Sequence, residues 1–419
     1  MKISSAFFIA LRYLLCRARE GGRYLRGAVF GIALSLIPII VTLIVADGMI
    51  RGITDRYLEL GTGHLQIFNF HNPLMPDSAL PFIEDLPGVR GIWSERQGLG
   101  VVLGDTGSRG ATIRAVNADF WEDEGSKRFL ETLSGEARLE SSNEVLLGEA
   151  LASYIGAEAG STVRIMTIRT GPMGNPIPRV TPFTVKGIIS SGYRDLDSLW
   201  CIMNLEAGIQ ILQDPSAYLI LKIDEPYNGA NIMASRLSER LGSGFGIYTW
   251  MSLQYSQYRS YESTRQLLLF IMALIVLIAA VNVSSATSML AIERQRDIAV
   301  LKAQGARPAF TSGIFLCGAF LTGVFGSLFG IGAGILIGSQ VNFIIRTLEI
   351  ILSFFSGIFS AGSVTILDTA YYLETIPVII DGGLITLIGI FTVLSSVLSS
   401  WIPAGRAGKL KPLDIMRKY

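Results

Sequence analysis

The chain has few of the side chains on which most enzyme chemistry depends. Only two histidines and three cysteines occur among its 419 residues, and charged residues make up 16%. Neither His64 nor His71 has a Cys, His or carboxylate pair nearby at metal-ligand spacing, so we expect a solvated or hydrogen-bonded structural role for both. The Gly-x-Ser-x-Gly motif of a serine nucleophile is also missing. This pattern argues against a catalytic chain and against a bound metal.

The sequence also lacks a complete phosphate-binding loop. Such a loop has four residues between its two glycines and a Ser or Thr after its lysine. Here two residues separate Gly405 from Gly408, and Lys409 is followed by Leu410. We therefore expect no cofactor on this chain, and any ATP and Mg must be used by a partner subunit.

Charge is absent from four long stretches, residues 28–46, 267–292, 308–345 and 382–405, while half of all residues are apolar. A bilayer core of about 30 Å needs about 20 helical residues, so each stretch can cross it. The sequence predicts four transmembrane helices at 28–50, 266–292, 308–345 and 382–403. Residues 346–381 contain an amphipathic pattern typical of a helix at the membrane surface. A fifth span there is the alternative, and it would move the basic C-terminus to the outer side.

Basic residues flank the first and last spans, and they predict that both termini are cytosolic. They are Lys2, Arg12, Arg17, Arg19, Arg23, Arg26, Arg406, Lys409, Lys411, Arg417 and Lys418. Residues 1–27 then form a cytosolic amphipathic helix, 293–307 a cytosolic loop and 404–419 a cytosolic basic tail. Residues 51–265 and 346–381 lie outside. The first apolar run is too long for a cleaved signal peptide and is expected to remain as an anchor.

The large outer segment reads as a mixed α/β domain on helical stalks. Strand-like runs occupy residues 64–70, 98–102, 111–116, 162–167, 183–189 and 218–223. Helix-like runs occupy 145–155 and 228–241. The length allows one domain or two.

Two features of the spans bear on helix packing. Gly326, Gly330, Gly334 and Gly338 recur every fourth residue, which aligns them on one helix face where a neighbouring backbone can approach closely. Asn282 is polar at membrane depth and is expected to bond to a neighbouring helix or to face a cavity.

The loop at 293–307 has the pattern of a short helix with one apolar side, formed by Ile298 and Leu301, and Gly305 as its C-terminal cap. One interpretation is a helix lying flat on lipid headgroups. Its mixed charges favour a protein groove instead, because an anionic surface selects basic residues alone. The residues expected to contact a partner are Glu293, Arg294, Arg296, Asp297, Leu301, Lys302 and Gly305.

Residues 293–306, Glu-Arg-Gln-Arg-Asp-Ile-Ala-Val-Leu-Lys-Ala-Gln-Gly-Ala, resemble the cytosolic coupling helix of the MacB and FtsX-like permeases of ABC transporters. The order of elements resembles that family over essentially the whole chain, and most closely the lipoprotein-releasing permeases LolC and LolE. Similar signatures are Asp47-Gly48-Met49, residues 371–378 and residues 401–412. The resemblance implies a MacB-like periplasmic domain between the first two helices.

A nine-residue segment resembles the hook with which LolC holds a periplasmic lipoprotein carrier. It consists of Gly171, Pro172, Met173, Gly174, Asn175, Pro176, Ile177, Pro178 and Arg179. Its prolines and glycines predict a projecting semi-rigid loop that cannot join a strand ladder. Arg179 matches the basic residue at the end of the hook. The alternative is a plain hairpin tip.

The resemblance implies a multi-pass permease of the bacterial inner membrane. Its expected partners are a cytosolic ABC ATPase dimer, a second permease copy or a LolC/LolE-type paralogue, a periplasmic lipoprotein carrier, a lipoprotein substrate and membrane lipid, but no nucleic acid. Lipid is expected to enter near Val45, Ala46 and Met49. Two alternatives share the architecture: a MacB-like exporter of peptides or small molecules, and an FtsX-like regulator that transports nothing.

Overall fold

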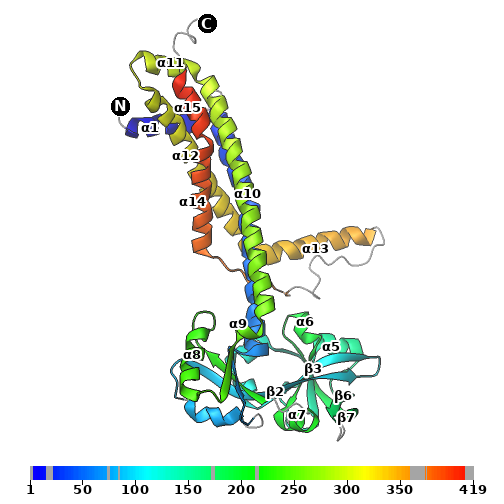
Figure 1. The fold of residues 1–419 in the computed structure, drawn as a ribbon. Helices are drawn as coiled ribbons and strands as arrows, with labels where there is room; N and C mark the ends of the chain where they lie inside the picture. Colours follow the sequence, from blue (N-terminus) through cyan, green and yellow to red (C-terminus); the bar gives the residue numbers. More distant parts are fainter. Residues whose placement is uncertain are drawn as a thin grey trace. The chain divides into compact units, whose positions relative to one another are not determined.

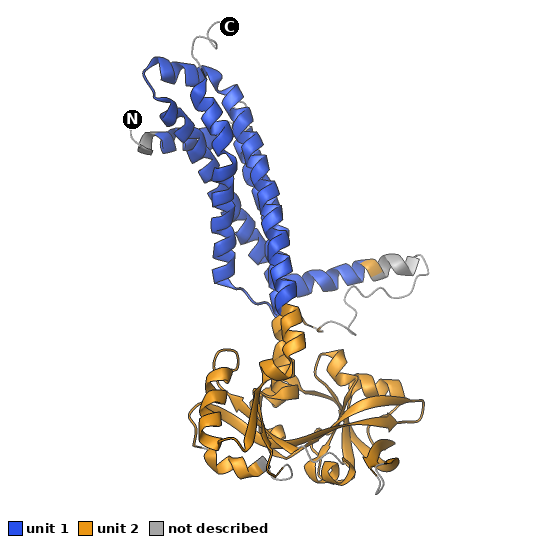
Figure 2. Cartoon of the chain, in the orientation of Figure 1, with its two compact units in different colours: residues 1–48, 262–351, 376–419 blue, residues 49–261, 352–375 orange. Residues whose placement is uncertain are grey.

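The computed structural model describes residues 3–15, 22–72, 76–83, 85–170, 175–212, 217–358, 373 and 375–410. The chain divides into two compact units (Figure 2). Unit 1 comprises residues 1–48, 262–351 and 376–419, and unit 2 comprises residues 49–261 and 352–375. Each is described separately below.

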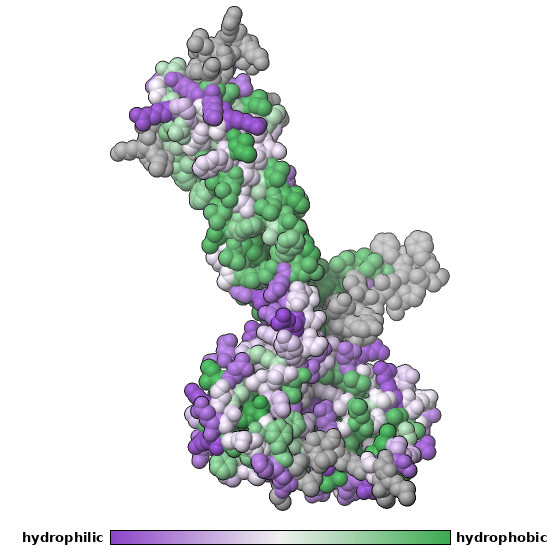
Figure 3. Space-filling view, viewed as in Figure 1, coloured by the Kyte–Doolittle hydropathy of each residue, from purple (hydrophilic) through white to green (hydrophobic). Residues whose placement is uncertain are grey.

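Unit 1 is helical (Figure 1). Its helices, three of which continue across a unit boundary, are α1 (Ile3–Leu15), α2 (Gly22–Arg56), α10 (Tyr255–Glu293), α11 (Gln295–Ala303), α12 (Pro308–Ser339), α13 (Val341–Ile358), α14 (Gly382–Ser399) and α15 (Trp401–Lys409). High-hydropathy side chains cover the long helices, and hydrophilic side chains gather at the end that carries α11 (Figure 3). The apolar residues thus face the surroundings along the length of the bundle, as lipid requires.

Four helices of the described chain are long and apolar enough to cross a membrane: Tyr24–Thr62, Tyr255–Glu293, Pro308–Ser339 and Gly382–Lys409. This confirms the predicted number of spans. Their ends differ from the predicted bounds, because α12 stops at Ser339 and Val341 begins α13. The uncharged run 308–345 therefore belongs to two successive helices. Similarly, Ser400 separates α14 from α15, within the predicted fourth span.

Unit 2 contains a mixed sheet of ten strands in the described residues. The strands are β1 (Leu65–Asn69), β2 (Val89–Leu103), β3 (Ser108–Val116), β4 (Glu131–Gly135), β5 (Glu144–Gly148), β6 (Thr162–Thr170), β7 (Pro176–Ser190), β8 (Trp200–Asn204), β9 (Ala217–Ile223) and β10 (Phe245–Thr249). Their order is β10-β1-β9-β2-β3-β8-β5-β7-β4, and β6 pairs with β2 and β7. The long strand β2 joins the two halves, since it pairs with β9 over its first part and with β3 over its second.

Short helices cover the sheet of unit 2. They are η2 (Tyr57–Thr62, a π-helix), η3 (Pro76–Phe82, a 3₁₀-helix), α3 (Asp119–Glu122), α4 (Glu124–Phe129), α5 (Glu149–Ile155), α6 (Arg194–Asp197), α7 (Leu205–Ile211), α8 (Ala230–Leu241) and α9 (Trp250–Leu253). One core packs α5 and α7 on β3, β5, β7 and β8, and another packs α8 on β1 and β9.

Two secondary-structure predictions for unit 2 were wrong. Residues 145–155, predicted as one helix, contain strand β5 and then helix α5. Gly148 is the N-cap of α5 and lies so close to the Asp197 backbone that a side chain would collide with it. Strands β4, β8 and β10 had no counterpart among the predicted strands.

The prediction that the proline-rich segment stays out of a strand ladder was also wrong for its described part. Pro176 and Pro178 belong to β7 and lie opposite Thr170 and Ile168 of β6. Val185 exchanges backbone hydrogen bonds with residues 160 and 161, so odd-numbered residues of β7 point their backbone groups toward β6. The backbone nitrogens of the even-numbered prolines, which carry no hydrogen, point away from β6. No hydrogen bond of the β6–β7 ladder is therefore lost.

Candidate functional site

The connection between α10 and α12 is built around the short helix α11. Arg294 interrupts the helix after α10, and α11 ends at Ala303. Gly305 has a positive φ of 90°, Gly305 N donates to Lys302 O at 3.0 Å and Ala306 N donates to Leu301 O at 3.0 Å. These paired bonds form a Schellman C-cap, which glycine accommodates without strain. The predicted cap at Gly305 is therefore present.

One face of α11 packs into the core of unit 1. Ile298 and Ala299 are both 2% exposed, and Ile298 belongs to a cluster with Leu290, Phe315 and Ala404. The cluster joins α1, α2, α10, α11, α12 and α15. Because six helices share this core, a force applied to α11 meets a packed structure instead of a free loop.

Arg294, Asp297 and Lys302, which are predicted to contact a partner, form bonds within the chain. Arg294 Nη1 lies 3.1 Å from Asp297 Oδ2, and its guanidinium lies 5.0 Å from the centre of the Tyr13 ring. Lys302 Nζ donates to the carbonyl oxygens of Gly408 and Leu410, both at 2.6 Å. These contacts fasten α11 to α1 and to the end of α15.

The opposite face of α11 is exposed. Arg296, Val300 and Gln304 follow one another at intervals of four residues, and Val300 is 50% exposed. Glu293 and Arg307 are exposed at the two ends of the connection, whereas Leu301 is half-buried. We call Arg296, Val300 and Gln304 the outer face of α11. Val300 and Gln304 were not among the residues predicted to contact a partner, although their spacing opposite Ile298 was a usable signal.

The glycine series of α12 packs against α2. A Cβ atom placed on any of the four would come too close to a side chain of α2. The distances are 2.8 Å from Gly326 to Ile32 Cβ, 2.8 Å from Gly330 to Leu36 Cβ, 2.7 Å from Gly334 to Ile40 Cβ and 2.6 Å from Gly338 to Ile44 Cδ1. Both helices contribute every fourth residue, so the contact continues over residues 326–338 of α12.

Val45, Ala46 and Met49 lie in α2 and are each half-buried. Met49 packs against the unit 2 core that includes Ile53. The lipid entrance at these residues stays a prediction.

The predicted hook lies at the end of the β6–β7 hairpin. Gly171, Pro172, Met173 and Gly174 fall outside the described residues, and Asn175 is exposed. Ile168, Ile177 and Val180 are 67%, 50% and 52% exposed, so the described part of the hairpin presents apolar side chains. Arg179 Nη1 donates to Gln210 O at the end of α7 at 2.8 Å. This bond ties the hairpin to α7.

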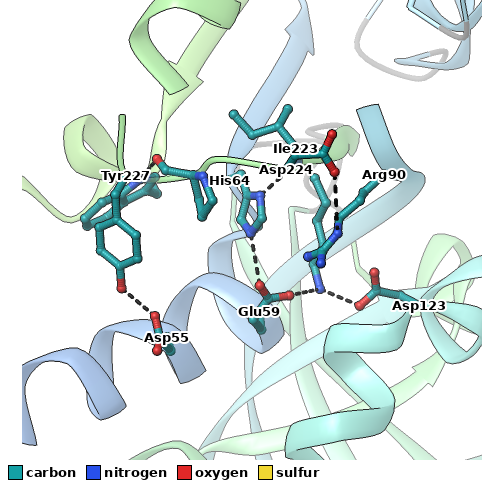
Figure 4. A network of polar contacts seen from close by, with 12 residues as sticks. Asp55, Glu59, His64, Arg90, Asp123, Ile223, Asp224 and Tyr227 are labelled. Atoms are coloured by element: carbon teal, nitrogen blue, oxygen red, sulfur yellow. Dashed lines mark hydrogen bonds and ion pairs between the residues drawn. The ribbon is translucent and has the colours of Figure 1, made fainter. Parts of the chain in front are cut away.

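A buried polar network holds η2 against the sheet of unit 2 (Figure 4). Lys222 is fully buried and its Nζ donates to Glu59 Oε2 at 2.7 Å and to Asp123 Oδ2. His64 Nδ1 accepts from the Ile223 backbone N–H at 2.9 Å, so its Nε2–H is directed to Glu59 Oε1 at 3.3 Å. His64 therefore has the expected hydrogen-bonded structural position. His71, by contrast, is exposed.

The hydroxyl of Tyr227 extends this arrangement by donating to Asp55. Burial raises the pKa of Tyr227, and the hydrogen bond to Asp55 raises it further. The phenol therefore stays protonated at neutral pH and remains a donor. No group of three or more His, Cys, Asp or Glu residues suited to a metal ion occurs in the described parts of the chain.

Comparison with protein families gives two matches. The FtsX-like permease C-terminal model matches residues 269–412, and the MacB-like periplasmic core domain model matches residues 27–235. Together they include most of α2, most of unit 2 and the chain from Leu269 in α10 to the end of α15.

Individual relatives match over nearly the full length. The lipoprotein-releasing system transmembrane protein LolC of Neisseria meningitidis serogroup B is 26% identical over 98% of both chains. The corresponding LolE protein of Haemophilus influenzae is 20% identical over 100% of both chains. The periplasmic region of MacB from Actinobacillus actinomycetemcomitans covers 49% of this chain and 95% of its own, with 17% identity and a TM-score of 0.31.

Proposed function

Because the chain belongs to the MacB- and FtsX-like permeases and is of the LolC/LolE type, we propose that it moves lipoproteins out of the inner membrane using ATP hydrolysed by a separate subunit. In this proposal both termini and α11 face the cytosol, and unit 2 lies in the periplasm. The chain is a multi-pass membrane protein and acts as a non-catalytic permease subunit.

The outer face of α11 is the observation that carries the proposal. It presents a cation, an aliphatic side chain and an amide on one surface, while Ile298 and Ala299 anchor the other side. A helix that is exposed on one face and packed against neighbouring helices on the other is suited to receive a push from a docked protein. We assign this face to the ATPase.

The test compares two charge reversals of the same kind. Arg296→Glu changes the outer face of α11, and Arg406→Glu changes an exposed arginine on the neighbouring helix α15. Copurification of the ATPase with the full-length permease is expected to fall strongly for Arg296→Glu and to change little for Arg406→Glu. Equal recovery of the ATPase with both variants would count against the assignment.

The exposed polar residues of α10 support a second permease copy or a paralogue. Asn282 and Ser285 are exposed in this candidate span. A polar side chain facing hydrocarbon is costly, so a partner helix at this face is favoured. Cysteine at position 282 is expected to crosslink two permease chains in membranes, and cysteine at the glycine-packed position Ile40 is not.

The energetics of acyl chains favour delivery of the lipoprotein to a carrier. Each CH₂ moved from an apolar site into water costs about 0.8 kcal/mol, so extraction needs both an energy source and an apolar acceptor. The β6–β7 hairpin, with its exposed apolar residues, is our candidate for holding the carrier. Ile177→Asp is expected to reduce crosslinking to the carrier, with Leu133→Asp on β4 as the control, because Leu133 is a comparably exposed apolar residue. Unchanged crosslinking of Ile177→Asp would remove the hairpin from the proposal.

A further inference from the structure

An apolar site lies within unit 1, between α10 and α14. It is a groove of about 370 Å³ with only aliphatic, aromatic and thioether side chains on its walls. Met272, Ala273 and Val276 form one wall, and Leu387, Phe391 and Leu394 contribute to the other. Leu387 and Leu394 are 64% and 55% exposed, so the groove opens to the surroundings of the bundle. It includes none of Val45, Ala46 and Met49.

The length of the groove fits one leaflet. Its α14 wall runs from Leu384 to Leu394, which is about 15 Å at 1.5 Å per residue. Half of a hydrocarbon core of about 30 Å has the same thickness. A single acyl chain lying along the groove would therefore extend from the interface to the middle of the bilayer.

A charged cluster lies about one helical turn beyond the same end of both walls. Arg265 precedes Leu269 on α10, and Asp381 precedes Leu384 on α14. Arg265 Nε lies 3.0 Å from Asp47 Oδ1, and its Nη2 lies 3.4 Å from Asp381 Oδ2. The side chains of Arg265 and Asp381 are 41% and 43% exposed, so a headgroup can reach both. One cation and two carboxylates give the cluster a net charge of −1.

We propose that this groove binds a phospholipid with an amine-bearing zwitterionic headgroup, whose acyl chain lies between α10 and α14 while its headgroup contacts Arg265 and Asp381. The guanidinium of Arg265 is a donor for the phosphate. The carboxylates attract the ammonium, and their excess negative charge disfavours a purely anionic headgroup. The placement in the periplasmic leaflet rests on the proposed topology. Binding itself depends on neither the ATPase nor a lipoprotein, so the two proposals fail separately.

The test measures lipid bound to the full-length protein by native mass spectrometry after reconstitution in an equal mixture of phosphatidylethanolamine and phosphatidylglycerol. Ala273→Phe fills the groove, and Leu387→Asn places an amide on its wall. Val281→Phe adds the same ring on an exposed part of α10 outside the groove and serves as the control. We expect about tenfold lower phospholipid occupancy for Ala273→Phe, equivalent to about 1.4 kcal/mol, a decrease for Leu387→Asn and no change for Val281→Phe.

The headgroup is tested with Asp381→Asn. Asp381 Oδ1 also accepts from the backbone N–H groups of Gly383 and Leu384, and asparagine preserves this N-cap while removing the charge. The ratio of bound phosphatidylethanolamine to phosphatidylglycerol is expected to fall roughly threefold. Wild-type occupancy in both groove variants would overturn the proposal. So would recovery of an acylated peptide in place of phospholipid, or crosslinking that shows a second chain seated in the groove.

Discussion

The buried ion pair between Arg114 and Glu95 gives a sharp test of how unit 2 is held together. Both side chains are fully buried, and two parallel bonds join them, from Nε to Oε1 at 2.7 Å and from Nη2 to Oε2 at 2.8 Å. Arg114 also donates to Leu60 O at the end of η2, and its guanidinium lies 4.9 Å from the centre of the Trp200 ring. The pair therefore connects β2, β3 and η2.

Arg114→Met leaves the Glu95 carboxylate buried without its cation. Removing one partner of such a pair costs about 3–5 kcal/mol. Since 1 kcal/mol shifts Tm by about 2–4 °C in a domain of about this size, the melting temperature should fall by about 6–20 °C. Tryptophan fluorescence of the full-length protein in detergent reports this transition, because Trp93 and Trp200 are buried in unit 2.

The double variant Arg114→Met/Glu95→Met distinguishes the ion pair from simple loss of packing. It removes both charges, so it should recover part of the lost stability, although Leu60 O still lacks its donor. The ion pair does not have this role if the single variant melts within about 2 °C of the wild type, or if the double variant is no more stable than the single one.

Three further predictions follow from local geometry. Gly334→Ala should destabilise unit 1 by about 1–3 kcal/mol, because the added Cβ meets Ile40. Gly332→Ala should not destabilise it, because a Cβ at that position has nothing within 4 Å. Thermal unfolding of the two variants measures the difference. The pKa of Glu144 is lowered, first by the Glu140 backbone N–H and also by Ser141 N–H and Lys186. Its ionised form therefore stabilises the fold at pH values above the ordinary pKa of 4.5. In an acid titration, the difference in stability between wild type and Glu144→Gln should vanish once the pH falls below the pKa of Glu144 in the folded protein. Burial raises the pKa of Cys201 to about 12, so maleimide at pH 8 should label it only after denaturation, as peptide mass spectrometry would record.

Features that depend on helical periodicity alone could be predicted from the sequence. The four spans require only uncharged length, and the alignment of Gly330 and Gly334 requires only a repeat of four residues. The helix that packs against these glycines could not be predicted, because no local pattern indicates that α2 places Leu36 and Ile40 on this face.

Other features depended on contacts distant in sequence. The contact of Lys302 with a partner stays a prediction, but its bond within the chain could not be foreseen, because α15 folds back and places the carbonyl of Gly408 within 2.6 Å of its ammonium. The prolines of β7 were expected to prevent pairing, and only the strand register reveals that Pro176 and Pro178 point their nitrogens away from β6. For the prolines, residue type was read correctly, and the direction of the backbone groups decided the outcome.

The most direct test of the proposed function is site-specific photocrosslinking from Val300 in living cells. A photoreactive amino acid there projects from the outer face of α11, while Ile298 and Ala299 keep the helix anchored. The account predicts a covalent adduct between the permease and a cytosolic ABC ATPase, identified by mass spectrometry. Adducts to lipid alone, or to periplasmic proteins, would contradict it.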